Sequence, residues 1–218
     1  MKKATKKDIE FIKEQFIKNY DDAVTELDYT NDYELLIAII LSAQCTDKRV
    51  NIITPALFEK YPSVKELENA QLDDVKELLK SCSFFNNKAQ NIIKMAKAVS
   101  SEFDGHIPHD TKKLMSLAGV GNKTANVFMI EADGANLMAV DTHVFRVSHR
   151  LGLSDAKTVE KTEEQLVKKL KDDLHIFHQA MVLFGRYICK AVKPDCDKCF
   201  ISEVCKTKET FRRSWERP

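Results

Sequence analysis

The chain lacks any long hydrophobic run, and its longest one, Leu35–Leu41, has seven residues. A membrane-spanning helix needs about 20 apolar residues in a row, so the sequence predicts no membrane span. The first residues, MKKATKKDIE, are basic but precede no apolar stretch and no small-residue cleavage site, unlike a signal peptide. We therefore expect a cytoplasmic protein.

Glycine and proline are scarce, with 6 and 5 in 218 residues. No segment rich in Pro, Gly or Ser, no low-complexity stretch and no internal repeat is visible, so composition alone marks no domain boundary. Connections between elements must therefore be short. The 44% of hydrophobic and 31% of charged residues are typical of an ordered protein and argue against disorder.

The chain has no strong net charge, because 34 Lys and Arg stand against 33 Asp and Glu. A net charge of +1 does not by itself indicate an anionic partner such as a nucleic acid. Such a partner would need local positive charge. Residues 186–218 offer some, with nine Lys or Arg against five Asp or Glu.

Apolar residues recur at helical spacing along most of the chain, and strand-like alternation is nearly absent. The clearest stripes are Ile9, Ile12, Phe16 and Tyr20, then Phe85, Ala89, Ile92, Ala96, Val99 and Phe103. Asn31 with Glu34, and Ser63 with Glu66, have the spacing of capping boxes at helix starts. We predict an all-α fold of about ten helices with no sheet.

Four of the six cysteines lie within 17 positions, in the order Cys189-x6-Cys196-x2-Cys199-x5-Cys205. Four thiolates at such spacing can hold either a zinc ion or a [4Fe–4S] cluster. Only one Cys-x2-Cys pair is present, whereas zinc ribbons usually have two, which favours iron–sulfur. The other cysteines, Cys45 and Cys82, are expected to be buried small residues.

The segment LAGVGNKTAN, residues 117–126, predicts a tight hairpin between two helices. Gly119 and Gly121 permit a sharp turn and close backbone approach, and Val120 would pin the turn to the core. Backbone N–H groups at the start of the second helix, near Asn122, suit a phosphate. No strand precedes the turn, which excludes a dinucleotide-binding or Walker loop.

Lys123 falls in the first turn of the second helix. The helix dipole disfavours a protonated amine there, which suits an amine nucleophile, although a solvated surface lysine is the commoner case. Asp141, in the segment MAVDTHVFRV, follows apolar residues and precedes a helical pattern. It can be a helix cap, a carboxylate that faces Lys123, or both.

With these motifs the chain resembles the endonuclease III family of helix-hairpin-helix DNA glycosylases. The resemblance covers nearly the whole chain: LSAQCTD at 41–47, then LAGVGNKTAN, VDTHVFRV and the cysteine spacing. It implies two helical lobes that flank a DNA cleft. One is a six-helix barrel domain with the helix-hairpin-helix, residues 25–135. The other joins residues 1–24 to 136–218 as a discontinuous helical domain, with a [4Fe–4S] cluster held by the loop 189–205.

The resemblance also implies residue roles. Lys123 matches the Schiff-base lysine and Asp141 the catalytic aspartate. Gln44 matches a glutamine that fills the gap left by a flipped nucleotide, and Phe84 a wedge position that is often leucine. The remaining expected DNA contacts are Gly119, Val120, Gly121, His143, Lys190 and Lys193, and the expected cluster ligands are Cys189, Cys196, Cys199 and Cys205.

Two positions depart from the family pattern. Ala118 stands where proline is common, which should relax the hairpin slightly. Met115 stands where some members have a glutamate thought to position water, so no carboxylate role is expected at that site.

The activity implied is that of a base-excision-repair DNA glycosylase with AP lyase activity, which removes oxidised pyrimidines through a lysine Schiff base. Its partner would be double-stranded DNA with damaged bases or abasic sites, bound by a monomer that is nucleoid-associated if bacterial. Alternatives are a monofunctional mismatch or adenine glycosylase of the same superfamily, a non-catalytic helix-hairpin-helix DNA-binding protein, or an electron carrier. The range of lesions stays open.

Overall fold

A computed structural model describes residues 2–207 of the chain. These residues form eleven α-helices and one 3-10 helix, with no strand among them, which confirms the predicted all-α class with one helix more than expected. The helices are α1 (Lys6–Tyr20), α2 (Asp32–Ser42), α3 (Asp47–Lys60), α4 (Val64–Glu68), α5 (Leu72–Leu79), α6 (Phe85–Glu102), α7 (Thr111–Ser116), α8 (Asn122–Asp133), α9 (Thr142–Arg150), α10 (Val159–Leu170), α11 (Leu174–Tyr187) and η1 (Cys196–Lys198).

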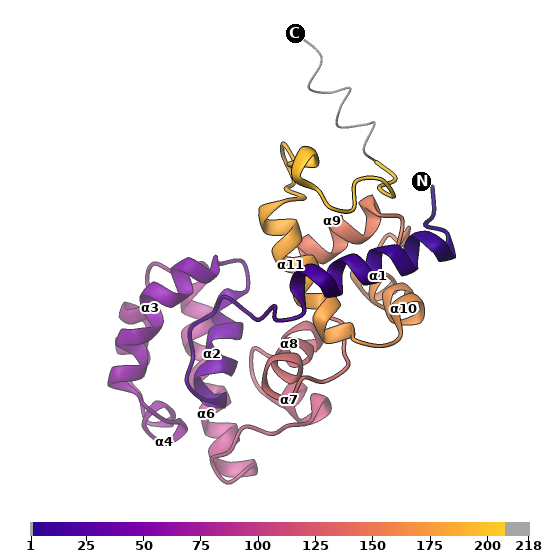
Figure 1. Cartoon of the computed structure of the whole chain (residues 1–218). Coiled ribbons are helices and arrows are strands. Elements are labelled where there is room, and N and C mark those ends of the chain that lie inside the picture. Colours follow the sequence, from indigo (N-terminus) through magenta and orange to yellow (C-terminus); the bar gives the residue numbers. More distant parts are fainter. Residues whose placement is uncertain (1, 208–218) are drawn as a thin grey trace. The chain divides into compact units, whose positions relative to one another are not determined.

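Contacts within the chain separate two units (Figure 1). Thr25–Asp133 forms one, the contiguous unit, and the described residues 2–24 and 134–207 form the other, the split unit. The sequence-based assignment placed the boundary after residue 135 where the structure has it after Asp133. Each unit has a hydrophobic core of its own. That these are a barrel domain and an iron–sulfur domain stays a prediction.

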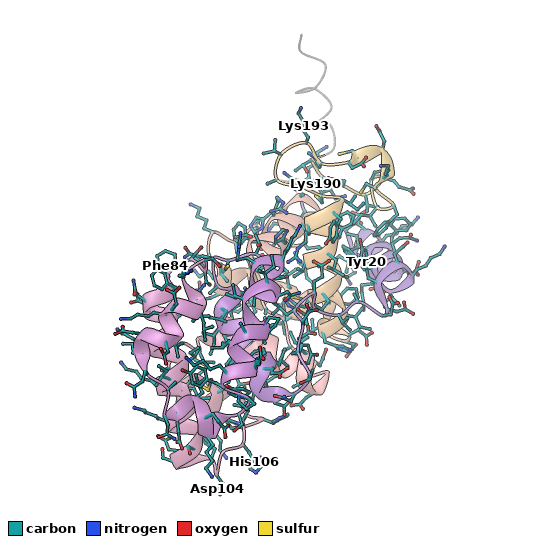
Figure 2. The ribbon with its side chains drawn as sticks, turned by 90° about the vertical axis from the view of Figure 1, so that its left-hand side faces the viewer. Tyr20, Phe84, Asp104, His106, Lys190 and Lys193 are labelled. Carbon is teal, nitrogen blue, oxygen red and sulfur yellow. The ribbon has the colours of Figure 1, made fainter. Side chains whose placement is uncertain are left out.

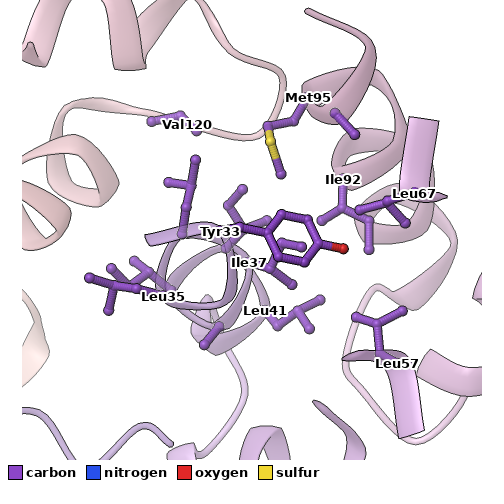
Figure 3. Close-up of a cluster of buried hydrophobic side chains, with 14 of the residues drawn as sticks. Tyr33, Leu35, Ile37, Leu41, Leu57, Leu67, Ile92, Met95 and Val120 are labelled. Atoms are coloured by element: carbon purple, nitrogen blue, oxygen red, sulfur yellow. The ribbon is translucent and has the colours of Figure 1, made fainter. Parts of the chain in front are cut away.

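Helix α2 forms the centre of the contiguous unit. Every residue from Leu35 to Leu41 is buried, as expected for a helix that is apolar all round. Figure 3 shows Leu57 of α3, Leu67 of α4 and Ile92 of α6 around it. Helices α3, α6 and α8 all pack on α2. The described residues 25–133 contain seven helices where a six-helix barrel was expected, and the extra one, α4, has only five residues.

The split unit joins segments from the two ends of the chain. Helix α1 packs on α10 and α11, and α9 packs on α11 (Figure 1). Phe16 of α1 makes edge-on ring contacts with Phe177 and Phe184 of α11 and with Phe200, at centroid distances of 5.4–6.5 Å. The predicted stripe of α1 is therefore the face that joins it to residues more than 150 positions away.

The helix caps differ in part from the predicted capping boxes. Asn31 caps α2 by accepting from Glu34 N, but the Glu34 carboxylate bonds Thr30 instead of closing the box. Ser63 accepts from Lys65 N, and its hydroxyl bonds the Glu66 carboxylate directly. Both predicted boxes are therefore wrong as reciprocal pairs, although both residues are N-caps.

A reciprocal box closes at Thr5 and Asp8 instead. The Thr5 hydroxyl accepts from Asp8 N, and Asp8 accepts from Thr5 N. The sequence search overlooked it because the third position is aspartate, where capping boxes usually have Glu or Gln.

None of the helices found in residues 2–207 combines the length and the apolar character that crossing a bilayer requires.

Candidate active site and cysteine cluster

The hairpin between α7 and α8 is built around Gly119. Its φ is +85°, a left-handed backbone that L side chains rarely adopt. A Cβ there would also lie 3.1 Å from the Cβ of Asn91 in α6. Val120 N donates to Leu117 O at 3.1 Å, and the Val120 side chain is buried in the core. The buried Val120 side chain thus anchors the turn to the hydrophobic core.

Gly121 has a different role from Gly119. Its φ is not positive, and a Cβ at this position would meet no atom within 4 Å. The glycine is therefore not needed for the turn itself, and it leaves open space in front of the first N–H groups of α8. Because the first N–H groups of a helix have no partner within the helix, this position can approach an anion.

Lys123 is the second residue of α8, and its side chain is exposed. Ala125 N donates to Gly121 O at 3.0 Å, so the helix has begun before the lysine. The lysine therefore lies in the first turn of α8, two residues after Gly121, within the contiguous unit.

Asp141 belongs to the split unit, where it is the N-cap of α9. Its Oδ1 accepts from Val144 N at 2.7 Å, and the carboxylate is half-buried. The three residues before it, Met138, Ala139 and Val140, are buried and fix the segment. One carboxylate oxygen makes the cap, and no hydrogen bond to Oδ2 is found within residues 2–207, so both predicted roles are compatible.

His143 is the second residue of α9, and its side chain accepts a hydrogen bond. Its Nδ1 is 3.1 Å from Arg146 Nη2, and a guanidinium can only donate. The neutral ring therefore has its proton on Nε2, a tautomer inferred from this contact. That N–H is a donor of the kind that a phosphate oxygen accepts.

Gln44 and Phe84 share an unusual backbone. Both have left-handed φ angles, 54° and 57°, and both side chains are exposed, Phe84 to 62%. Gln44 follows α2, and Phe84, labelled in Figure 2, immediately precedes α6. Non-glycine residues hold such angles only where surrounding contacts impose them, and such positions are frequent at functional sites.

The four clustered cysteines line one pocket in the split unit. Apolar side chains close its floor, including Leu151, Phe184 and Ile188. Cys189 N donates to Phe184 O at 2.7 Å, and Cys199 N to Cys196 O at 3.4 Å. Across the described residues, no three His, Cys, Asp or Glu side chains are close enough together to hold a single metal ion.

Burial dominates the electrostatics of these thiols. Burial, with a smaller contribution from the neighbouring cysteines, raises the pKa of Cys199 to about 11. Burial also raises the pKa of Cys189, although a hydrogen bond from Arg150 opposes this. Thiols of this kind stay protonated at neutral pH unless positive charge replaces the proton, as metal binding does.

Arg150, at the end of α9, holds the cysteine loop at both ends. Its Nη1 donates to Lys190 O at 2.7 Å and to Cys189 Sγ at 3.3 Å, and its Nη2 donates to Ala191 O at 3.1 Å. Its own carbonyl accepts from Lys206 N at 3.0 Å. The path of the loop is thus set by protein contacts.

Lys190 and Lys193 are exposed on this loop (Figure 2). Lys198 differs, because it pairs with Asp195 at 3.1 Å. Within the described part of the chain, no ion pair of Lys190 or Lys193 is found. Two cations of the loop are therefore available to an anionic ligand. The other positive charges expected between 208 and 218 lie outside the described residues.

The sequence search missed three residues that make several polar contacts with distant segments: Lys88, Arg146 and Arg150. Lys88 had a visible signal, since it lies on the same helix face as Phe85 and Ile92, where a lysine is out of place. The arginines had no such signal, because their contacts are with backbone carbonyls about 40 positions away.

Comparison with known proteins identifies the relatives of this chain. Residues 37–172 match the family model described as HhH-GPD superfamily base excision DNA repair protein. Endonuclease III of Rickettsia felis is 46% identical over 193 residues, which are 88% of this chain and 91% of that protein.

Solved structures agree with this result. The protein in a non-covalent endonuclease III–DNA complex is 40% identical, with a TM-score of 0.91 and coverage of 96% of this chain and 99% of that one. A trapped endonuclease III–DNA covalent intermediate, an estranged-adenine complex, gives the same values. The chain therefore belongs to the HhH-GPD superfamily of base excision DNA repair proteins and, within it, to the endonuclease III family.

Proposed function

We propose that Lys123 is the covalent nucleophile with which this protein removes damaged bases from double-stranded DNA. As a member of the endonuclease III family, the chain is a base-excision DNA glycosylase with AP lyase activity. The observation that carries the assignment of the nucleophile is the exposed lysine at the second position of α8, two residues after Gly121, whose Cβ position is open. The relative trapped as a covalent DNA intermediate supports a reaction of this kind.

The reaction begins with extrusion of the damaged nucleotide, which is easiest for a poorly stacked lesion. The neutral amine of Lys123 attacks C1′ while the N-glycosidic bond breaks, and the base leaves with the bonding electron pair and takes up a proton. The sugar ring opens to an iminium, which makes a C2′ proton acidic. Loss of that proton breaks the C3′–O bond, and water then hydrolyses the imine and restores the lysine.

Asp141 assists this reaction in our proposal. A carboxylate stabilises the positive charge that develops on the sugar and helps to transfer protons. Its cap to Val144 N fixes its position, and the second oxygen has no hydrogen bond within residues 2–207. His143 Nε2, Lys190 and Lys193 are proposed phosphate contacts, as are the N–H groups after Gly119 and Gly121.

We propose that Cys189, Cys196, Cys199 and Cys205 hold a [4Fe–4S] cluster. Each iron takes one thiolate, so the four sulfurs surround a pocket and do not converge on one atom, as zinc ligands at about 2.3 Å do. The four cysteines line one pocket, and this supports the cluster. A bound cluster would link the four cysteines and so support the loop that carries Lys190 and Lys193.

Borohydride trapping tests the nucleophile. Incubation with lesion-containing duplex and borohydride should convert the imine into a stable protein–DNA adduct, which gel electrophoresis detects. Lys123→Ala should bind the duplex but give no adduct and no nick. Lys112→Ala, which removes an exposed lysine from α7, is the matched control and should trap normally. Nearly normal nicking by Lys123→Ala contradicts the assignment.

Asp141→Asn belongs in the same assay, because asparagine keeps the cap acceptor. Base release should fall by about 10²–10⁴-fold, the usual contribution of general acid–base groups. Unchanged turnover would leave Asp141 as a helix cap alone.

The substrates we propose are oxidised pyrimidines and abasic sites, processed by a monomer in the cytoplasm. A panel of duplexes with one lesion each, assayed for strand cutting, tests the range. Size-exclusion chromatography with light scattering tests the monomer.

A further inference from the structure

Lys88 is a buried lysine in the first turn of α6. Lys88 is only 6% exposed. Its Nζ lies 2.8 Å from Leu41 O, 2.7 Å from Ala43 O and 3.3 Å from Cys82 Sγ. An ammonium has three N–H donors, and each of them has an acceptor here.

Two of these acceptors belong to the end of α2. Leu41 and Ala43 flank the last residue of that helix, where carbonyls have no partner within the helix. A cation at this end also opposes the negative end of the helix dipole. Burial of an unpaired ammonium is strongly unfavourable, so the contacts explain why a lysine persists in this core.

The third acceptor belongs to a second segment. Cys82 lies in the connection before α6, and its thiol also contacts Leu41 O at 3.6 Å. One ammonium therefore joins the segment after α2 to the segment before α6. These are the segments that present Gln44 and Phe84, both of them exposed residues with a left-handed backbone.

We propose that Lys88 is a positioning residue that fixes the Gln44 and Phe84 segments relative to one another for extrusion of the damaged nucleotide. The inference rests on the proposed function. Side chains that enter a base stack must arrive together and stay in place, because small displacements of positioning groups slow a reaction strongly. Lys88 itself touches no substrate, and its effect passes through the two segments.

The test compares Lys88→Met with Lys94→Met, a matched change at an exposed lysine of the same helix. One substrate has the lesion in a normal base pair, and the other has it opposite an abasic-site analogue, where less extrusion work is needed. 2-Aminopurine beside the lesion reports unstacking by its fluorescence. Far-UV circular dichroism confirms that each variant is folded.

Lys88→Met should lose about 10- to 100-fold in base release from the paired lesion, with a much smaller loss for the unpaired one. It should also lose the fluorescence rise, whereas Lys94→Met should match the unmodified protein throughout. Equal losses on both substrates, or a normal fluorescence rise, would overturn the proposal and leave Lys88 with a purely structural role.

Cys82→Ala is the second variant, and it decides the matter if Lys88→Met does not fold. It removes one of the three acceptors and should give a smaller loss that is still selective for the paired lesion. A non-selective loss or none contradicts the proposal. Failure of the proposed function is distinguishable, because the unmodified protein would then process neither substrate.

Discussion

At the scale of single residues, the two hairpin glycines serve different purposes. Gly119→Ala should destabilise the protein by about 1–2 kcal/mol, because alanine is strained at a left-handed φ and its Cβ would press on Asn91. Gly121→Ala should leave stability nearly unchanged, since its Cβ meets open space. Urea unfolding measures both.

The affinity for duplex DNA should distinguish the two glycines in the opposite way, with the larger effect at Gly121. If phosphate approaches Gly121, its alanine variant should bind duplex more weakly while remaining as stable as the unmodified protein. Equal destabilisation by the two substitutions would contradict the distinction between them.

The sequence predicted only those interactions that join residues close together in the chain. The hairpin, Asp141 as a cap and the burial of Val120 follow from neighbours in the chain. The partners of Lys88 lie 45 and 47 positions away, and spacing alone cannot reveal such contacts. The lysine could have been suspected from its helix face, but its acceptors could not.

At the scale of elements, His109 links helix ends in the contiguous unit. Its Nε2 lies 2.9 Å from Asp32 at the start of α2, and its Nδ1 lies 2.7 Å from Asp133 at the end of α8. Both nitrogens can donate only when the ring is protonated. The hydrogen bond to Asp32, followed by that to Asp133, raises the pKa of His109 above 6.5.

A pH dependence of stability follows from this link. Because the folded pKa is raised, the stabilisation is fully present below about pH 6.5 and is lost as the pH rises through the folded pKa. His109→Asn should therefore lower the free energy of unfolding at pH 5.5 and matter much less at pH 9. Urea unfolding at both pH values measures this. His106→Asn, in the same loop, should show no such difference, and a pH-independent effect at His109 would refute the link.

Helix positions were predictable because apolar stripes repeat every three or four residues over long segments, as α1 and α6 do. The hydrogen bonds of the capping boxes were harder to predict. Ser63 and Glu66 have the right spacing, but the hydroxyl bonds the carboxylate itself. Spacing identifies the residues that meet at a helix start, whereas the choice between several possible hydrogen bonds depends on side-chain geometry.

At the scale of the whole molecule, Asp8 ties the first helix to the last described segment. Its Oδ2 lies 2.7 Å from Lys206 Nζ, and both side chains are 17% exposed. The hydrogen bond from Lys206, with that from Thr5 N, lowers the pKa of Asp8 from 3.8 to about 2. The stabilisation is present above pH 3.8 and is lost as the pH falls through 2.

Asp8→Asn should cost about 1 kcal/mol at neutral pH, since it weakens an ion pair and a capping box. Hydrogen exchange should show faster opening in residues 2–20 and near Lys206, with no change in Thr25–Asp133. Glu14→Gln, an exposed change on α1, is the control. A uniform increase over both units contradicts a local tie.

The division of the split unit has a consequence for synthesis on the ribosome. The contiguous unit can collapse once its own residues have emerged, but α1 must wait for α11, its main packing partner. Synthesis of residues 21–187 takes roughly 10–30 s at about 5–20 residues per second. Until α11 has emerged, Ile12 and Phe16 lack their main packing partner, so the nascent chain offers a hydrophobic helix to any chaperone near the exit tunnel.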